Sequence, residues 1–325
     1  MKKVILGQDL EVSTIGLGCM GMSHAYGAPA CEQEMIKLIQ QAYHEGVTFF
    51  DTAECYVGLD KNNELTYNES ILGKALKEVR NKVVIATKFG VKWRDGATGP
   101  MILDSRPETI RASVEGSLKR LQTDYIDLYY QHRVDPNVPI EEVANVMKEL
   151  IQEGKIKHWG LSEAPIDIIK RAHAICPVTA IQSRYSMMFR ENEDKLFDTL
   201  EKLGIGFVAY SPLANGFLSG KYNHNSKFEE GIDFRSRMNH FKAENMDANQ
   251  VLLDLLNQLA IKKKATPAQI ALAWVVQKRP FIAAIPGTRK PDRLTENTRA
   301  GDIELTNEDM AILEEALKHI KIKGV

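Results

Sequence analysis

The sequence lacks the features that would assign it to several large classes of protein. Its 42 Lys and Arg residues nearly balance 43 Asp and Glu residues, so the formal net charge of -1 gives no overall attraction to nucleic acid or to an anionic membrane. No apolar stretch approaches the ~18–20 residues of a membrane-spanning helix, and the apolar run after Met1 ends too soon for a signal peptide. We therefore expect a cytoplasmic protein without nucleic-acid or membrane partners.

Cysteine is also scarce. The sequence contains four cysteines, Cys19, Cys31, Cys55 and Cys176. They show neither CxxC spacing nor the density of a secreted disulfide scaffold, so we predict reduced thiols and no metal site. Cys55 adjoins Tyr56 and leaves two interpretations open, a reactive thiol and a merely buried one.

The order of apolar segments indicates the fold. Two short alternating segments, 3–6 and 10–13, suit a hairpin at the N-terminus. Eight strand-like segments then follow, at residues 14–17, 47–50, 83–87, 125–130, 158–161, 180–182, 206–210 and 282–285. Amphipathic stretches of helical period lie between them, including 34–45, 70–79, 107–120, 140–152 and 193–203.

Eight strand and helix units in 325 residues match the (β/α)8 TIM barrel in count and size. No Pro/Gly/Ser-rich linker divides the chain, so we predict one α/β barrel domain over residues 1–325, with an N-terminal hairpin at 1–13. A doubly wound parallel sheet is the alternative fold.

A glycine-rich segment matches the glycine spacing of a dinucleotide-binding motif, which would favour the doubly wound sheet, but its surroundings do not match that motif. Residues 16–21 read GxGxxG after a strand, but a dinucleotide fingerprint requires a helix at once and an acid about 20 residues later. Loop-type residues follow here, and Asp51, the first acid at a strand end, comes about ten residues too late. We expect instead a loop at the barrel mouth that brings Met20, Met22, His24 and Tyr26 to the substrate, with simple packing of these side chains as the alternative.

Four polar residues lie where strand-like segments end: Asp51, Tyr56, Lys88 and His132. The carboxyl ends of barrel strands meet at one mouth, which is where barrel enzymes keep their chemistry. Taken one at a time, these residues have ordinary structural explanations. Asp51 and Lys88 could form an ion pair at the barrel end, Tyr56 could be an aromatic at the rim, and His132 could be a buried histidine with its hydrogen bonds satisfied. Together they predict an active site.

Segments around these residues resemble the signatures of the aldo-keto reductase superfamily. The matching segments are 50–56, 87–90 and 130–133, followed in the same order by 160–162, 181–183, 210–213 and 285–289 with 296–297. The resemblance covers nearly the whole chain. It implies a nicotinamide-dependent carbonyl reductase acting on a small aldehyde or ketone.

The chemistry of the four residues agrees with this resemblance. Carbonyl reduction needs a hydride on one face and a proton at the oxygen, where negative charge develops. Tyr56 is the expected proton donor, and Lys88 is expected to lower the pKa of its phenol. Asp51 would keep Lys88 charged and oriented, and His132 would hold the carbonyl oxygen.

The resemblance also implies a cofactor, NADPH in preference to NADH, in a groove across the strand ends. Ser162 and Gln182 would bind the nicotinamide carboxamide, Tyr210 would stack under the ring, and residues 212–247 would form a strap over the pyrophosphate. The other implied cofactor residues are Ser211, Pro212, Leu213, Gly216, Lys221, Ile285, Gly287, Thr288, Arg289, Arg293, Glu296 and Asn297. Arg289 and Arg293 suit a phosphate, because a guanidinium can bind it through two hydrogen bonds.

Some residues depart from the family pattern or leave alternatives open. Glu163 stands where many members have asparagine, and Gly287 where many have a phosphate-binding lysine. Trp93, in a long loop after Lys88, is expected to border the substrate pocket. Two other functions remain: a binding subunit that senses nicotinamide nucleotide with little turnover, and a lyase that forms a Schiff base on Lys88.

Overall fold

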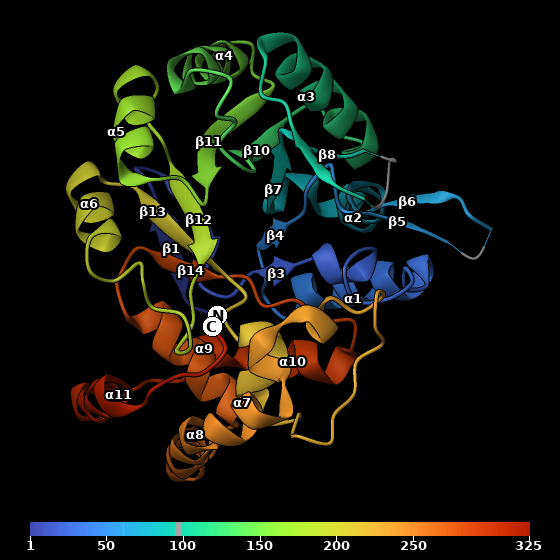
Figure 1. The fold of residues 1–325 in the computed structure, drawn as a ribbon. Coiled ribbons are helices and arrows are strands. Elements are labelled where there is room, and N and C mark those ends of the chain that lie inside the picture. The colour runs from blue at the N-terminus through green and yellow to red at the C-terminus, as the bar shows by residue number, and fades with distance from the viewer. Residues whose placement is uncertain (61, 95–98) are drawn as a thin grey trace.

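The computed structural model describes residues 1–60, 62–94 and 99–325. Within these residues the centre of the molecule is an eight-stranded parallel sheet in which the strands follow one another in chain order (Figure 1). The strands are β3 (Leu17–Gly18), β4 (Phe49–Asp51), β7 (Val84–Phe89), β10 (Ile126–Gln131), β11 (Ile156–Ser162), β12 (Ala180–Arg184), β13 (Gly206–Tyr210) and β14 (Ile282–Ala284).

The two edges of this sheet join and close it into a barrel. Ile15 forms a parallel bridge with Ala284, and the Gly16 amide donates to the Ala284 carbonyl at 2.8 Å. The Ala284 amide in turn donates to the Thr14 carbonyl at 2.9 Å. The predicted (β/α)8 barrel is therefore confirmed, and the doubly wound alternative is wrong.

Helices surround the barrel because each has one apolar face. In α4, for example, Val143, Met147 and Leu150 are buried at helical spacing. The helices are α1 (Glu32–His44), α2 (Asn68–Leu76), α3 (Pro107–Leu121), α4 (Ile140–Gln152), α5 (Ile166–Ile175), α6 (Leu196–Leu203), α7 (Ala243–Ala248), α8 (Gln250–Lys263), α9 (Pro267–Gln277), α10 (Pro291–Arg299) and α11 (Asn307–His319). None of the helices in the described ranges is both long and apolar enough to cross a membrane.

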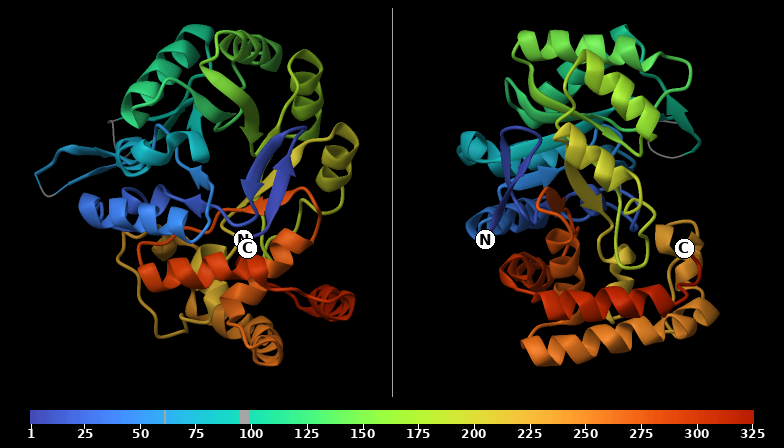
Figure 2. Two further views of the ribbon diagram at one scale, coloured as in Figure 1. Left: turned by 180° about the vertical axis from the view of Figure 1, so that it is seen from behind. Right: turned by 90° about the vertical axis from the view of Figure 1, so that its left-hand side faces the viewer.

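The N-terminal hairpin closes one end of the barrel, as Figure 2 shows from behind. Its strands, β1 (Lys3–Leu6) and β2 (Leu10–Ser13), pair antiparallel. Leu6 is fully buried and packs with the side chains inside the barrel. It approaches the start of β13 so closely that a Cβ atom on Gly206 would lie 2.7 Å from the Leu6 Cα. The hairpin thus leaves the opposite end of the barrel for a site.

Three long connections extend that opposite end. Two of them form antiparallel hairpins that the sequence did not predict, β5 (Val57–Leu59) with β6 (Leu65–Tyr67) and β8 (Val91–Trp93) with β9 (Met101–Leu103). The third, residues 212–247, contains the short helices η3 (Ala214–Ser219), η4 (Phe234–Arg237) and η5 (Asn239–Phe241). This third connection reaches the loop after β3, where the Phe234 amide donates to the Ala25 carbonyl at 2.8 Å.

Candidate active site

The fold brings the four predicted catalytic residues together at the carboxyl ends of three neighbouring strands. Asp51 ends β4, Lys88 lies in β7 and His132 follows β10, while Tyr56 lies in the turn after β4. Strand β7 pairs with both β4 and β10. The strand register therefore explains why residues up to 81 positions apart, from Asp51 to His132, share one mouth.

Lys88 is the centre of the hydrogen bonding in this mouth. Its side chain is 0% exposed, and its Nζ donates to Asp51 Oδ1 at 2.5 Å, to the Thr52 carbonyl at 2.7 Å and to the Tyr56 hydroxyl at 3.3 Å. The second carboxylate oxygen of Asp51 accepts from Gln182 Nε2 at 2.7 Å. The ammonium is thus paired and held against the phenol.

The pKa of Tyr56 departs from the sequence-based expectation. Burial of the phenol raises its pKa well above the ordinary value, and the negative charge of Asp51 raises it further. The net shift of the Tyr56 pKa is therefore upward rather than downward as predicted, with burial as its largest cause. The phenol consequently stays protonated at neutral pH. Its oxygen accepts from Lys88, so its own proton can be donated to a ligand.

His132 is uncharged at neutral pH, also because it is buried. Burial lowers its pKa well below the ordinary value, and the nearby charges of Lys88 and Arg133 lower it further. Its ring stands edge-on to Tyr56, with 5.7 Å between the centroids, and its Nδ1 lies 3.4 Å from the Cys55 sulfur. A neutral imidazole can hold a carbonyl oxygen by a hydrogen bond but adds no charge.

Cys55 is a buried thiol, 5% exposed, and burial raises its pKa to about 12. The thiolate, which is the reactive form, is therefore rare at neutral pH. Of the two interpretations left open by the sequence, the structure supports the buried one.

Of the predicted substrate residues, Met20, His24 and Trp93 adjoin the proposed catalytic residues, whereas Met22 is buried in the main hydrophobic core, so its placement at the substrate is wrong. Met20 and Trp93 pack against the small apolar cluster that contains Tyr56, and Trp93 Nε1 donates to the Cys55 carbonyl at 2.8 Å. The His24 ring stacks on Trp93 with 5.2 Å between centroids. Tyr26 is turned instead toward the 212–247 connection.

Tyr26 contacts that connection through its hydroxyl, which accepts from Asn215 Nδ2 at 2.7 Å. Its backbone also bridges Asp233, and the Arg235 guanidinium lies 5.3 Å from the ring centroid. Arg235 is itself paired with Asp233 at 2.5 Å. These contacts join the loop after β3 to residues 212–247 across the mouth.

The residues expected to bind nicotinamide lie at the same edge of the barrel. Ser162 ends β11 and is in register with Gln182 on β12, and Tyr210 ends β13. Burial, together with the Glu163 carboxylate beside it, raises the pKa of Tyr210 to about 12. Glu163 has a φ of 54° and its Oε1 accepts from the Arg184 amide at 2.8 Å. One oxygen of the Glu163 carboxylate is thus already hydrogen-bonded within the protein.

The residues expected to bind phosphate follow β14. Arg289 donates through Nε to the Gly21 carbonyl and through Nη1 to the Ala28 carbonyl at 3.0 Å. Gly287 is explained by packing, since a Cβ atom there would lie 2.8 Å from the Gly18 carbonyl oxygen. The remaining expected cofactor residues divide among three places: Arg293, Glu296 and Asn297 on α10; Ser211, Pro212, Leu213, Gly216 and Lys221 after β13; Ile285 and Thr288 after β14.

The glycines of the GxGxxG segment have the same kind of explanation. A Cβ atom on Gly16 would lie 2.8 Å from the Phe49 carbonyl oxygen, and one on Gly18 would lie 2.7 Å from the Ile285 carbonyl oxygen. These glycines let β3 pack between its neighbours where the barrel closes. This packing is consistent with the prediction that residues 16–21 do not form a dinucleotide-binding fingerprint.

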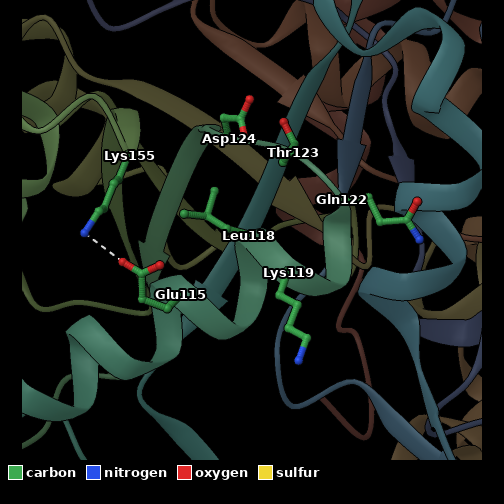
Figure 3. Close-up of a pocket in the computed structure, with 7 residues that line it drawn as sticks. All are labelled: Glu115, Leu118, Lys119, Gln122, Thr123, Asp124 and Lys155. Carbon is green, nitrogen blue, oxygen red and sulfur yellow. Dashed lines mark ion pairs between the residues drawn. The ribbon is translucent and has the colours of Figure 1, made fainter.

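The surface cleft drawn in Figure 3 does not coincide with this site. It has a volume of about 510 Å³ and is lined by the end of α3 and the residues that precede β10 and β11. It therefore lies at the amino ends of the strands, opposite the catalytic group. Its side chains Glu115 and Lys155 form an ion pair at 2.7 Å on the surface. We assign the chemistry to the mouth, where buried polar groups converge.

Some contacts in the mouth could not be found from sequence spacing. The bond between Gln182 and Asp51 crosses the barrel between residues 131 positions apart. Arg133 was noticed only as part of a signature segment, yet its Nη1 donates to the Ser162 hydroxyl at 3.0 Å. Within the described residues, no group of three or more His, Cys, Asp and Glu side chains is arranged to hold a metal ion.

Comparisons with known proteins agree with this geometry. The model of the aldo/keto reductase family matches residues 14–318. The chain is 44% identical over 314 residues to probable aldo-keto reductase 1 from Glycine max, covering 95% of this chain and 87% of that protein. Among solved structures, a glycerol dehydrogenase from Gluconobacter oxydans superposes with a TM-score of 0.87 at 29% identity, over 99% of this chain and 97% of that one.

A second solved structure is an aldo/keto reductase from Klebsiella pneumoniae, in complex with NADP and acetate. It superposes with a TM-score of 0.71 at 25% identity, over 98% of this chain and 96% of that one.

Proposed function

Because the chain belongs to the aldo/keto reductase family, we propose that it transfers a hydride from NADPH to the carbonyl carbon of a small aldehyde or ketone, with Tyr56 as the general acid. The reverse reaction oxidises the alcohol. The observation that carries this proposal is the buried chain of hydrogen bonds from Asp51 through Lys88 to the Tyr56 hydroxyl.

The catalytic residues act at the carbonyl oxygen. When the hydride arrives at the carbon, the C=O π bond breaks and negative charge develops on the oxygen. A neutral His132 holds this oxygen by hydrogen bonding, and Tyr56 donates its hydroxyl proton to it. The phenolate left on Tyr56 is stabilised by Lys88, whose charge is kept in place by Asp51.

The residues at the mouth fit a nicotinamide dinucleotide. The cofactor, when bound, supplies the hydride; Ser162 and Gln182 would hold its carboxamide, and Tyr210 would support its ring. Arg289 offers a donor for a phosphate, because its buried Nη2 finds no acceptor among the described residues. An additional phosphate is the feature that distinguishes NADPH from NADH, so this donor and Arg293 favour NADPH.

The connection 212–247 is proposed to cover the pyrophosphate. Its contacts with the loop after β3, through Asn215 and Tyr26 and through Phe234 and Ala25, run across the mouth. They support a strap that encloses an extended ligand between the two segments. The whole of residues 1–325 would then act as one barrel domain, with each strand end adding to a single site.

The test is NADPH oxidation at neutral pH with a panel of small aldehydes and ketones. Tyr56→Phe removes the donated proton and keeps the ring, so we expect its kcat to fall by about 10²–10⁴ while NADPH binding, followed by fluorescence, is unchanged. Tyr43→Phe on α1 is the matched control and should retain full activity.

Two outcomes would contradict the proposal. If Tyr56→Phe keeps its rate, the general acid lies elsewhere. If the unchanged protein binds NADPH but turns over none of the carbonyl compounds, the alternative of a nucleotide-sensing subunit gains support. Borohydride trapping of a substrate on Lys88 would instead favour the lyase.

A further inference from the structure

Arg133 places a positive charge at the mouth that carbonyl reduction itself does not need. It lies two residues beyond the end of β10, next to His132. Its Nη1 donates to the His132 carbonyl at 2.6 Å and to the Ser162 hydroxyl at 3.0 Å. These two bonds fix the guanidinium between the ends of the paired strands β10 and β11. The side chain is half-buried and therefore only partly solvated.

The charge of Arg133 is not neutralised by the protein. Within the described part of the chain, no carboxylate oxygen lies within 4.0 Å of its guanidinium, whereas Asp51 and Lys88 neutralise each other at 2.5 Å. On Tyr56 its charge opposes the burial that raises the pKa, and on His132 it adds to burial and to Lys88 in lowering the pKa. Arg133 therefore places a positive charge without an ion-pair partner, among the described residues, near Tyr56 and His132.

The unused edge of the guanidinium suits one kind of ligand. Because Nη1 is engaged, Nε and Nη2 remain, and neither has an acceptor among the described residues. Two parallel N–H groups on one edge bind a carboxylate through two hydrogen bonds. The neighbouring Glu163 does not use this edge, because its Oε1 accepts from the Arg184 amide.

We propose that Arg133 recognises a carboxylate on the substrate, so that the preferred substrates are small carbonyl compounds that also bear a carboxylate. This substrate class rests on the proposed reductase function and narrows it. Arg133 would orient the substrate while Tyr56 and His132 act on its oxygen. A neutral carbonyl compound would still react, but without this anchor.

The experiment compares 4-carboxybenzaldehyde with 4-formylbenzamide, which have nearly the same size and differ in charge. We expect the unchanged enzyme to favour the acid about 10- to 100-fold in kcat/KM, the range of a charge-assisted hydrogen bond. Arg133→Met should abolish this preference by lowering kcat/KM for the acid about 10- to 100-fold more than for the amide, while Arg133→Lys should retain part of the preference. Raising the salt concentration should reduce the preference.

Arg184→Met is the matched control. Arg184 ends β12 at the same edge, but its guanidinium lies over the Phe189 ring at 4.6 Å, so its loss should leave the preference intact. The proposal is overturned if the unchanged enzyme does not favour the acid. It is also overturned if Arg133→Met lowers both substrates equally, because Arg133 would then only orient Ser162.

Failure of the reductase function can be separated from failure of the anion site. If neither aldehyde is reduced, isothermal titration calorimetry can measure the binding of benzoate and of benzamide to the protein in the presence of NADPH. This tests anion recognition without turnover. Tighter binding of benzoate that is lost in Arg133→Met would sustain the anion site. Equal binding of the two compounds would overturn it.

Discussion

Replacing Lys88 by methionine would leave the charge of Asp51 isolated inside the barrel mouth. In the intact protein the two side chains are 0% and 3% exposed and 2.5 Å apart. Removing one partner of a buried ion pair costs about 3–5 kcal/mol, because the remaining charge is desolvated without compensation. We expect Lys88→Met to lose about this much free energy of unfolding at pH 8, which is a large share of the 5–15 kcal/mol of a typical domain.

The loss should depend on pH in a defined direction. Burial already raises the pKa of Asp51, and the charge of Lys88 opposes this rise. Without the lysine the folded-state pKa rises further, while the unfolded chain keeps about 3.9. Between these two values the folded protein binds a proton that the unfolded chain has released, so stability falls as the pH rises. The variant should therefore be nearest to wild type at about pH 4–5 and farthest from it at pH 8.

A second substitution identifies the cause of the loss. In the double variant Asp51→Asn/Lys88→Met both charges are gone, so we expect most of the stability to return while activity stays lost. Urea unfolding at pH 5 and pH 8, followed by circular dichroism, measures both variants. An equal loss at the two pH values, or a double variant no more stable than Lys88→Met, would refute the isolated-carboxylate argument.

Two further predictions concern packing and thiol chemistry. Gly73→Ala should destabilise the protein by about 1–3 kcal/mol in chemical unfolding, because its Cβ would lie 2.5 Å from the Leu121 carbonyl oxygen. Gly116→Ala is its control and should destabilise less, since its Cβ would meet the Arg120 side chain at 3.0 Å rather than backbone, and Arg120 need shift only by a few tenths of an ångström within its ion pair with Glu69. Iodoacetamide at pH 8 should alkylate the exposed Cys31 much faster than the buried Cys55, as peptide mass spectrometry would show; comparable rates would contradict the burial of Cys55.

The barrel could be predicted because its strands leave a strong local pattern. Each of the eight apolar segments became a strand of the barrel, with ends shifted by a few residues, as in β11 (Ile156–Ser162) against the expected 158–161. The convergence of Asp51, Tyr56, Lys88 and His132 followed from polar residues at strand ends, since parallel strands bring those ends together. Local pattern and topology were sufficient for the barrel and for this convergence, while the catalytic role of the four residues stays a prediction.

The rest depends on tertiary contacts that have no local pattern. The hairpin of β5 and β6 was missed because its strands are only three residues long and show little alternation; its Gly58 is so tightly packed that a Cβ atom would lie 2.1 Å from the Ser23 carbonyl oxygen. The direction of the Tyr56 pKa was wrong because the sequence reveals a neighbouring lysine but not the degree of burial. The orientation of Arg289 toward the Gly21 and Ala28 carbonyls likewise depends on how one loop lies over another.

The hydrogen bond from Gln182 to Asp51 joins two halves of the chain with different tasks. All four proposed catalytic residues lie before residue 133, whereas the proposed nicotinamide and phosphate contacts begin at Ser162 and continue to Asn297. The proposed function would thus separate proton chemistry from nucleotide binding along the chain, and hydrogen bonds such as Gln182 to Asp51 and Arg133 to Ser162 would couple the two. Under that proposal, substitutions in the first half would act mainly on reduction of the carbonyl compound, and those in the second half mainly on binding of the nucleotide.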